Sequence, residues 1–444
     1  MANQVDKLNT ISITSIEKVN TLTDANIEKI NTLEFTGTVD LAVNTLSTDV
    51  SGNSTRHWGL SQAYDEDNNQ IIFAYGDNNN SDYGTVRVMA SDKSLGTAVV
   101  FSNSGETYHT GAVYNTSDNR LMVAYHTTNN DNDYRIIGGT MGTKTVTFAS
   151  GGHTVVDAGG SGVENQGDAT DICSYNPTSN VAIVAIEKGD TSGDPNYVFA
   201  CTIDTADDSI TVGTGQEFTD AVVERFQLTY DPDIGKTVAI YDNGTKIAAR
   251  VISLSGTGNR TIAVGTEAAY GNNSGPAGGG QNQGTWAVYD TTNNTHHVYI
   301  SDDSAGYKIV YFTVSGTTVT WCATSQAHDP EATTAACRAI LYSQSRNKLM
   351  AIGHSNASGS GTLEFDIHTF AHSGTPDSTS GSYTHDSSTG STTIEGSIVT
   401  AHCMNCGLDG VNATSFVGGE LFCYSLDISN DGDDLRAKGL EPGT

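Results

Sequence analysis

The chain has 444 residues, a length that fits two or three ordinary domains or one array of repeats. Its 51 acidic and 21 basic residues give a net charge of −30, which disfavours nucleic acid and anionic membranes as partners. We find no run of about 20 apolar residues that could span a bilayer. The first residues lack the layout of a signal peptide, so we expect a protein made in a cytosol that either stays there or leaves it by assembly or lysis.

Residues 1–33 contain a repeat with a period of 11 residues. Its three copies are V-D-K-L-N-T-I, I-E-K-V-N-T-L and I-E-K-I-N-T-L, at residues 5–11, 16–22 and 27–33. The apolar positions would share one side of an α-helix, but Thr, Asn and Ile are poor helix formers. A helical bundle and a small solenoid therefore both remain open. Three such units cannot bury their apolar faces alone, so we predict a docking or oligomerisation arm rather than a packing tail.

A longer repeat begins with a hairpin signature at Tyr64, which opens the string Y-D-E-D-N-N-Q-I-I-F-A-Y. The pattern is a strand, a polar turn and an apolar strand. It returns at Tyr114, Tyr175, Tyr230, Tyr289 and Tyr342, at intervals of 50 to 61 residues. The Asp, Asn or Ser after each Tyr can accept a hydrogen bond from the backbone two residues on.

The fifth residue after each of these tyrosines is Asn or Gly, the types that tolerate a left-handed backbone. They are Asn69, Asn119, Asn180, Gly235, Asn294 and Asn347.

Each long repeat has four predicted strands. In the first repeat, the first strand ends at Tyr64. The second, third and fourth strands cover residues 71–75, 83–90 and 97–101. Four antiparallel strands per repeat predict an all-β fold, a six- or seven-bladed β-propeller over residues 57–427. The second strands are the most continuously apolar, as expected between neighbouring blades. An array of β-sandwiches is the competing interpretation, but it does not explain why one hairpin recurs at near-constant spacing.

The remaining segments complete this organisation. Residues 34–56 are a linker, in which a strand at 34–43 could complete the last blade and close the ring. A seventh blade could come from residues 392–427, after a long loop at 373–393. Residues 428–444 are predicted to be a loose polar tail.

Several motifs suggest chemistry only weakly. Cys403-x-x-Cys406, with His402 and Cys423, could bind zinc but lacks a second pair. Residues 427–433 match the opening of a calcium loop, yet Lys438 stands where such a loop needs Glu. The Asn/Asp clusters at 77–82 and 129–133 are predicted loops, and His296-His297 a polar turn in a hairpin loop. Cys173, Cys201, Cys322 and Cys337 are predicted to be buried thiols in strands.

No catalytic signature stands out. Residues 301–307 only loosely match a sialidase-type box, and no second copy occurs. The arginines that could form a sialidase-type triad are scattered: Arg56, Arg87, Arg135, Arg225, Arg250 and Arg338. There is no G-x-S-x-G, H-E-x-x-H or phosphate loop. We therefore expect no enzyme, no catalytic residue, no cofactor and no metal.

The I-E-K-V-N-T-L and I-E-K-I-N-T-L units resemble repeats that open virion proteins of tailed bacteriophages, especially those of marine hosts. The Y-D-P-D-I-G-K-T-V-A-I-Y hairpin is similar to propeller repeats of the same proteins. The resemblance implies a tail-fibre, tail-tip or head-decoration protein, located in the virion and extracellular after lysis. It would be a homo-oligomer, bound to other virion proteins through residues 1–33, with a host-surface glycan or protein as possible ligand. A bacterial adhesin or filament subunit and a propeller glycosidase are the alternatives.

Overall fold

The structure, a computed structural model, is built almost wholly of strands. It describes residues 7–8, 11–12, 18–19, 22–23, 29–30, 33–34, 41–49, 57–65, 67–68, 70–77, 80–90, 94–127, 133–150, 153–157, 172–186, 195–221, 223, 226–243, 246–271, 274–276, 287–302, 306–323, 336–343, 348–356, 363–373, 382–388, 392–394, 398–404, 420–428 and 432–442. They include the short 3-10 turn η4 (Thr257–Asn259). None of them forms a helix of the length and apolar character needed to cross a bilayer.

Seven sheets of four or five strands follow one another among the described residues. The first is β8 (His57–Asp65), β9 (Gln70–Asp77), β10 (Tyr83–Ala90) and β11 (Val99–Ser102); the second is β12 (Thr107–Asn115), β13 (Arg120–Thr127), β14 (Asp133–Gly142), β15 (Thr145–Phe148) and β16 (Thr154–Asp157). The third is β17 (Cys173–Asn176), β18 (Val181–Ile186), β19 (Asn196–Ile203), β20 (Ile210–Val212) and β21 (Gln216–Thr219); the fourth is β22 (Phe226–Asp231), β23 (Lys236–Asp242), β24 (Ile247–Ser255), β25 (Thr261–Val264) and β26 (Ala268–Ala269).

The last three sheets follow the same plan. The fifth is β27 (Ser274–Pro276), β28 (Ala287–Asp290), β29 (Thr295–Asp302), β30 (Gly306–Ser315) and β31 (Thr318–Trp321); the sixth is β32 (Ala336–Ser343), β33 (Lys348–Asn356), β34 (Leu363–Ser373), β35 (Ser382–Ser388) and β36 (Thr392–Ile394). The seventh is β37 (Ile398–Met404), β38 (Glu420–Ile428), β39 (Gly432–Pro442) and β7 (Leu41–Asp49). The predicted long loop at 373–393 is wrong in part, because β35 and β36 pair with β34 there despite their Ser/Thr composition.

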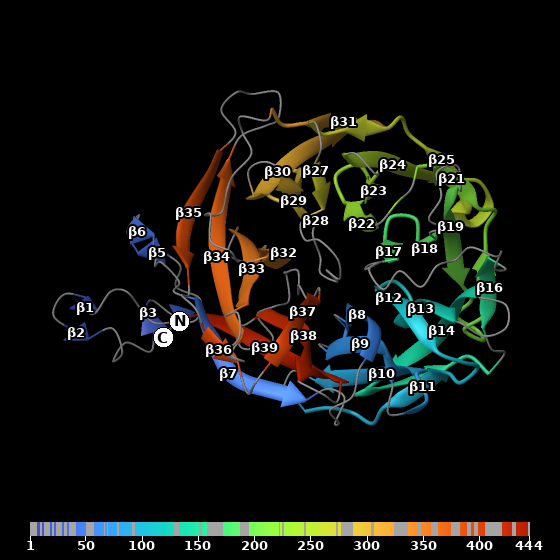
Figure 1. Cartoon of the computed structure of the whole chain (residues 1–444), viewed down its shortest axis with the longest axis horizontal. Helices are drawn as coiled ribbons and strands as arrows, with labels where there is room; N and C mark the ends of the chain where they lie inside the picture. The colour runs from blue at the N-terminus through green and yellow to red at the C-terminus, as the bar shows by residue number, and fades with distance from the viewer. Residues whose placement is uncertain are drawn as a thin grey trace.

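The sheets stand around a common axis and make a β-propeller (Figure 1). Within each sheet the paired strands run antiparallel, and the first strand is innermost and the fourth at the rim; they follow sequence order except in the seventh sheet, where β7 is the outer strand, and in the fifth, where β27 and β28 both pair with β29. The loops between first and second strands therefore lie on the same face of the ring as the turns between third and fourth strands. Short extra strands pair with the third strand in four sheets, which the four-strand expectation did not include.

The two ends of the chain meet in the seventh sheet. β7 pairs antiparallel with β39, with Ser47 opposite Lys438. The closing strand lies at Leu41–Asp49 rather than at the predicted 34–43. The expectation of a loose tail at 428–444 is wrong, because Gly432–Pro442 is a strand hydrogen-bonded on both sides. Backbone pairing to two neighbours can hold a polar strand that carries no apolar pattern.

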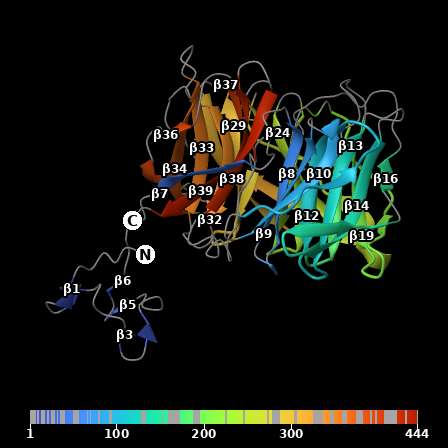
Figure 2. The same cartoon turned by 90° about the horizontal axis from the view of Figure 1, so that it is seen from below.

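The 11-residue repeat forms three separate two-stranded hairpins beside the ring (Figure 2). They are β1 (Lys7–Leu8) with β2 (Ile11–Ser12), β3 (Lys18–Val19) with β4 (Leu22–Thr23), and β5 (Lys29–Ile30) with β6 (Leu33–Glu34). The helical interpretation of this repeat is wrong. In each copy an Asn-Thr pair separates two apolar residues that pair across the hairpin, which favours a turn over a helix.

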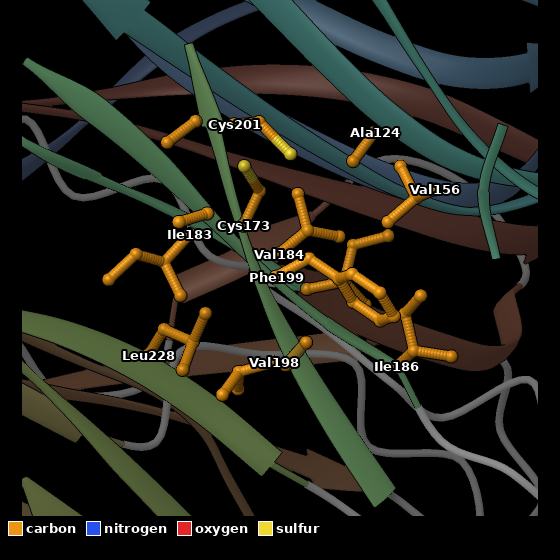
Figure 3. Close-up of a cluster of buried hydrophobic side chains, with 14 of the residues drawn as sticks. Ala124, Val156, Cys173, Ile183, Val184, Ile186, Val198, Phe199, Cys201 and Leu228 are labelled. Atoms are coloured by element: carbon orange, nitrogen blue, oxygen red, sulfur yellow. The ribbon is translucent and has the colours of Figure 1, made fainter. Parts of the chain in front are cut away.

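The core lies between neighbouring sheets rather than inside one of them. All six residues of β18 are buried, and the second strands β9, β13 and β23 are buried almost throughout. This confirms the prediction from their continuous apolar character. Figure 3 shows Ile183 and Val184 of β18 between Ala124 of the second sheet and Leu228 of the fourth. Each fully buried aliphatic side chain contributes about 1.5–3 kcal/mol, so every interface between sheets is strongly stabilised.

Candidate functional site

The hairpin loops on one face of the ring share a turn closed by the residue after the repeat tyrosine. Asn115 Oδ1 accepts from the backbone N–H of Ser117 at 3.0 Å and of Asp118 at 3.1 Å. Asp65, Asn176, Asp231 and Asp290 accept in the same way in their own sheets. All five side chains are buried. The predicted side-chain-to-backbone turn is thus confirmed in five repeats.

The left-handed position is also where the sequence places it. Among the described repeats, φ is +52° at Asn119, +53° at Asn180, +64° at Gly235 and +55° at Asn294. The equivalent Asn69 and Asn347 lie outside the described residues.

Four of the repeat tyrosines link their hairpin to the one before it. Tyr175 O–H reaches Asn115 Oδ1 in the second sheet at 2.8 Å, and Tyr230 bonds Thr178 Oγ1 at 2.6 Å. Tyr342 bonds Thr292 Oγ1 at 2.6 Å, and Tyr114 donates to Asp67. Burial, and then the carboxylate of Asp67, raise the pKa of Tyr114. These tyrosines are therefore structural joints, and their hydroxyls are committed to protein partners.

A second set of joints connects the start of the second strand to the next sheet in the first, second and fourth sheets. Gln70 Nε2 donates to the carbonyl of Gly142 at 2.7 Å, and Lys236 Nζ to that of Gly316 at 2.9 Å. Arg120 forms an ion pair with Asp208. Each acceptor lies in the turn between third and fourth strands of the following sheet. On this face the short hairpin loops of the repeats are therefore linked from sheet to sheet by polar contacts.

The joint between the fifth and sixth sheets differs from the others because two histidines and a carboxylate gather there. Asp290 ends β28, His297 lies on β29, and His372 comes from β34 of the next sheet. All three are buried, and their ligating atoms lie within 4.8 Å of one another. His297 Nε2 is 3.6 Å from Asp290 Oδ2, and the rings of His297 and His372 meet edge to face at 4.6 Å.

The ionisation of this cluster follows from burial and pairing. Burial opposes the charge on Asp290, but hydrogen bonds from His297 and Asn293 outweigh it and lower the pKa of the carboxyl. Burial lowers the pKa of His297, against the pull of Asp290. Burial and the neighbouring His297 lower the pKa of His372 to about 3. At neutral pH the carboxylate is charged and both imidazoles are neutral.

The predicted polar turn at His296-His297 is wrong. Both residues lie inside β29 and are fully buried on opposite faces. His296 Nε2 is 3.2 Å from Asp231 Oδ2 of the fourth sheet, and its Nδ1 is 3.1 Å from Thr229 Oγ1. Polar histidines can be buried here because each has a carboxylate and a hydroxyl partner. The sequence analysis missed His372 altogether, since no motif links it to His297 75 residues earlier.

The other candidate motifs do not assemble into a site within the described residues. Cys403 lies on β37 and Cys423 on β38, while Cys406 lies outside the described residues. Asp427 pairs with Asp433 across the hairpin of β38 and β39, and Ser429 and Asp431 lie outside the described residues. The cluster at 77–82 is the loop between β9 and β10, as predicted, and 129–133 lies mostly outside the described residues. Cys173, Cys201 and Cys322 are buried free thiols, although Cys322 follows β31 rather than lying in a strand.

The arginines with described side chains do not converge. Arg87 donates to the carbonyl of Gly96, Arg135 pairs with Asp133, and Arg250 pairs with Glu267. Each of these contacts stays within one sheet. Arg56 and Arg225 lie outside the described residues, as does the side chain of Arg338.

Comparisons with known proteins find likeness in fold only. No protein-family model matches the sequence, and no curated protein matches it. Similar solved structures include a protein of unknown function from Dyadobacter fermentans, at 10% identity and TM-score 0.47, covering 90% of this chain and 99% of the other. The β-propeller domain of Cps50 (Swd1) from Myceliophteria thermophila has the same identity and TM-score and covers 90% and 100%. An ulvan-type polysaccharide lyase has 8% identity and TM-score 0.46 and covers 89% and 94%. At these values none of them informs on activity.

Proposed function

We propose that this protein is a structural virion component of a tailed phage that displays a β-propeller for recognition of the host surface. The ring is the displayed part, and the hairpins of residues 1–33 attach it to other virion proteins. The N-terminal repeats resemble those of phage virion proteins, and this resemblance suggests the setting.

The observation that carries the proposal is the form of the arm. Its three hairpins have strands of only two residues each, and they lie beside the ring (Figure 2). An isolated two-stranded hairpin is marginally stable at best. Three such hairpins in series therefore need another surface, either other copies of the arm or a second virion protein. The arm precedes β7 in the sequence, and β7 is the strand that closes the ring. The arm is therefore attached to the ring through the seventh sheet.

Ligand recognition belongs to the face opposite the hairpin network. On the network face the six repeat hairpins have short connections of equal length, and the joints described above engage many of their side chains; the longer connection at residues 405–419 of the seventh sheet is the exception on this face. On the opposite face the connections between second and third strands vary in length, from residues 303–305 to residues 187–195. Loops of variable length on a rigid scaffold are the usual place for binding residues. A host-surface glycan or protein is the proposed ligand.

Mass spectrometry and immunogold microscopy of gradient-purified particles test the virion assignment. We expect the protein at a fixed copy number per particle. A variant that lacks residues 1–34 should fold but fail to enter particles. Presence on uninfected cells, with none in particles, would instead support an adhesin or filament subunit. Release of sugar from host envelope by purified protein would support a glycosidase.

A further inference from the structure

The buried cluster at the joint between the fifth and sixth sheets has the composition of a metal site. We propose that Asp290, His297 and His372 bind one divalent transition-metal ion of the zinc class, which clamps these two sheets together. Two imidazoles and one carboxylate are a common protein ligand set for such ions. The proposal is independent of the virion assignment, because it concerns the interior of the ring.

The distances are close to those that a bound ion requires. In a tetrahedral zinc site with bonds of about 2.0–2.1 Å, neighbouring ligand atoms are about 3.3 Å apart. His297 Nε2 and Asp290 Oδ2 are already 3.6 Å apart, and the three ligating atoms lie within 4.8 Å of one another. A contraction of at most about 1.5 Å, within reach of side-chain rotation, completes the geometry. Thr295 Oγ1, at 2.9 Å from His297 Nε2, is an oxygen beside the fourth position.

Surrounding groups hold the carboxylate in place, as outer groups do in metal sites. Asn293 Nδ2 donates to Asp290 Oδ2 at 2.7 Å, and the backbone of Thr292 and Asn293 donates to Oδ1. The same Asn293 amide reaches the carbonyl of His372 at 3.3 Å. One amide therefore positions ligands from both sheets.

Comparison among the repeats shows that this joint lacks a long polar side chain at the start of its second strand. At the start of the second strand, Gln70, Arg120 and Lys236 reach across to the following sheet. Val181 holds this position in the third sheet and Thr295 in the fifth, where the Thr295 hydroxyl bonds to His297. A metal held by His297 and His372 would replace the missing long side chain. Within the described part of the chain, no other three histidine, cysteine or acidic side chains come together in this way.

His296 provides a matched control on the same strand. It is equally buried, next to a carboxylate and a threonine, but it faces the fourth sheet and has no second histidine. His296→Gln therefore perturbs a similar histidine–carboxylate pair without removing a proposed ligand. Cys403→Ser/Cys406→Ser separates this cluster from the other weak zinc candidate.

The experiment uses the full chain without a histidine tag, stripped of metal by chelator during unfolding and refolded with or without Zn²⁺, so that burial does not block access. We expect one zinc per chain after desalting and a rise in Tm of a few degrees, because the ion binds the folded state. The bound zinc and the rise in Tm should both be lost in Asp290→Asn, His297→Gln and His372→Gln. Both should be retained in His296→Gln and in the cysteine double variant.

Refolding wild-type protein with Co²⁺ gives a readout that needs no variant. We expect visible absorption without the near-ultraviolet bands of thiolate ligation. Less than half an equivalent of zinc in wild-type protein, thiolate bands, or zinc retained by the His297→Gln/His372→Gln double variant would each overturn the proposal.

Discussion

The hydroxyl of Tyr175 donates to the side-chain oxygen of Asn115 at 2.8 Å, across 60 residues of sequence and from one sheet of the ring to the next. The same Asn115 oxygen closes its own turn by accepting from the backbone of Ser117, and its amide donates to Asn180 at 2.7 Å. A residue that shapes one hairpin thus also holds the following one. In the other joints the tyrosine bonds the third residue after the preceding tyrosine, as Tyr230 does with Thr178 and Tyr342 with Thr292.

Tyr175→Phe should destabilise the ring by about 1–2 kcal/mol, because it leaves buried Asn115 short of one donor. Tyr230→Phe should cost less, since the Tyr230 hydroxyl meets the hydroxyl of Thr178 in a solvent-exposed contact. Urea denaturation of both variants measures the difference. Equal losses of unfolding free energy in the two variants, or no loss in Tyr175→Phe, would show that the tyrosines stabilise the protein through packing of their aromatic side chains and not through the hydroxyl hydrogen bonds.

Gly235 tests the left-handed position of the turn. Its φ is +64°, and an added Cβ would lie 3.2 Å from Thr178 Cγ2. Gly235→Ala should therefore cost about 1–2 kcal/mol. Gly235→Asn should cost less, because Asn tolerates this backbone and holds the equivalent place at residues 119, 180 and 294. Thermal melts of the two variants give the order, and an alanine variant as stable as the asparagine variant would contradict it.

Much of the ring could be predicted from the sequence, because the residues of each hairpin turn determine its geometry locally. Asp or Asn after the tyrosine, and Asn or Gly five residues on, each serve one local backbone requirement. The secondary structure of the arm was predicted wrongly, because apolar residues three positions apart fit one face of a helix as well as they fit two strands joined by a turn. The strand at Gly432–Pro442 was missed because its polar sequence has no strand pattern, and one of its two pairing partners, β7, lies hundreds of residues earlier in the sequence.

The cluster of Asp290, His297 and His372 lay beyond sequence reasoning for a related reason. Strand alternation could have separated His296 from His297, had the hairpin loop been ended at Asn294. The approach of His372, however, depends on how the sixth sheet packs against the fifth. Only the assembled ring brings that residue to the other two.

Truncation should separate the arm from the closing strand. Removing residues 1–34 takes away the three hairpins and should leave the Tm of the ring unchanged. Removing residues 1–49 also takes away β7, so β39 becomes an unpaired edge and the seventh sheet loses its outer strand. We expect a lower Tm and faster proteolysis at the C-terminal end. If both truncations melt alike, β7 does not close the ring.

His153 should make the ring less stable in acid. It packs edge to face on Tyr125 at 5.5 Å, and burial, followed by the charge of Arg135, lowers its pKa. Below the ordinary histidine pKa of about 6.5 the unfolded chain then binds more protons than the folded one, so stability falls as pH falls. His153→Gln should lose less stability than wild type between about pH 7.5 and about pH 5.5. Urea melts at the two pH values test this, and equal losses in both proteins would contradict it.

The rate at which the Cys201 thiol is alkylated should show when the sheets of the ring separate. Burial between the second strands raises the pKa of its thiol to about 12, so almost no thiolate exists at neutral pH. Cys322 is similar, with burial raising its pKa to about 11. Mass spectrometry after alkylation should find both thiols unmodified in folded protein and modified at the rate of global unfolding in urea. Labelling of Cys201 before the loss of circular dichroism would mean that the third sheet separates from its neighbours while the rest of the ring stays folded. Labelling coincident with unfolding would mean that the sheets melt as one cooperative unit, as continuous packing between them requires.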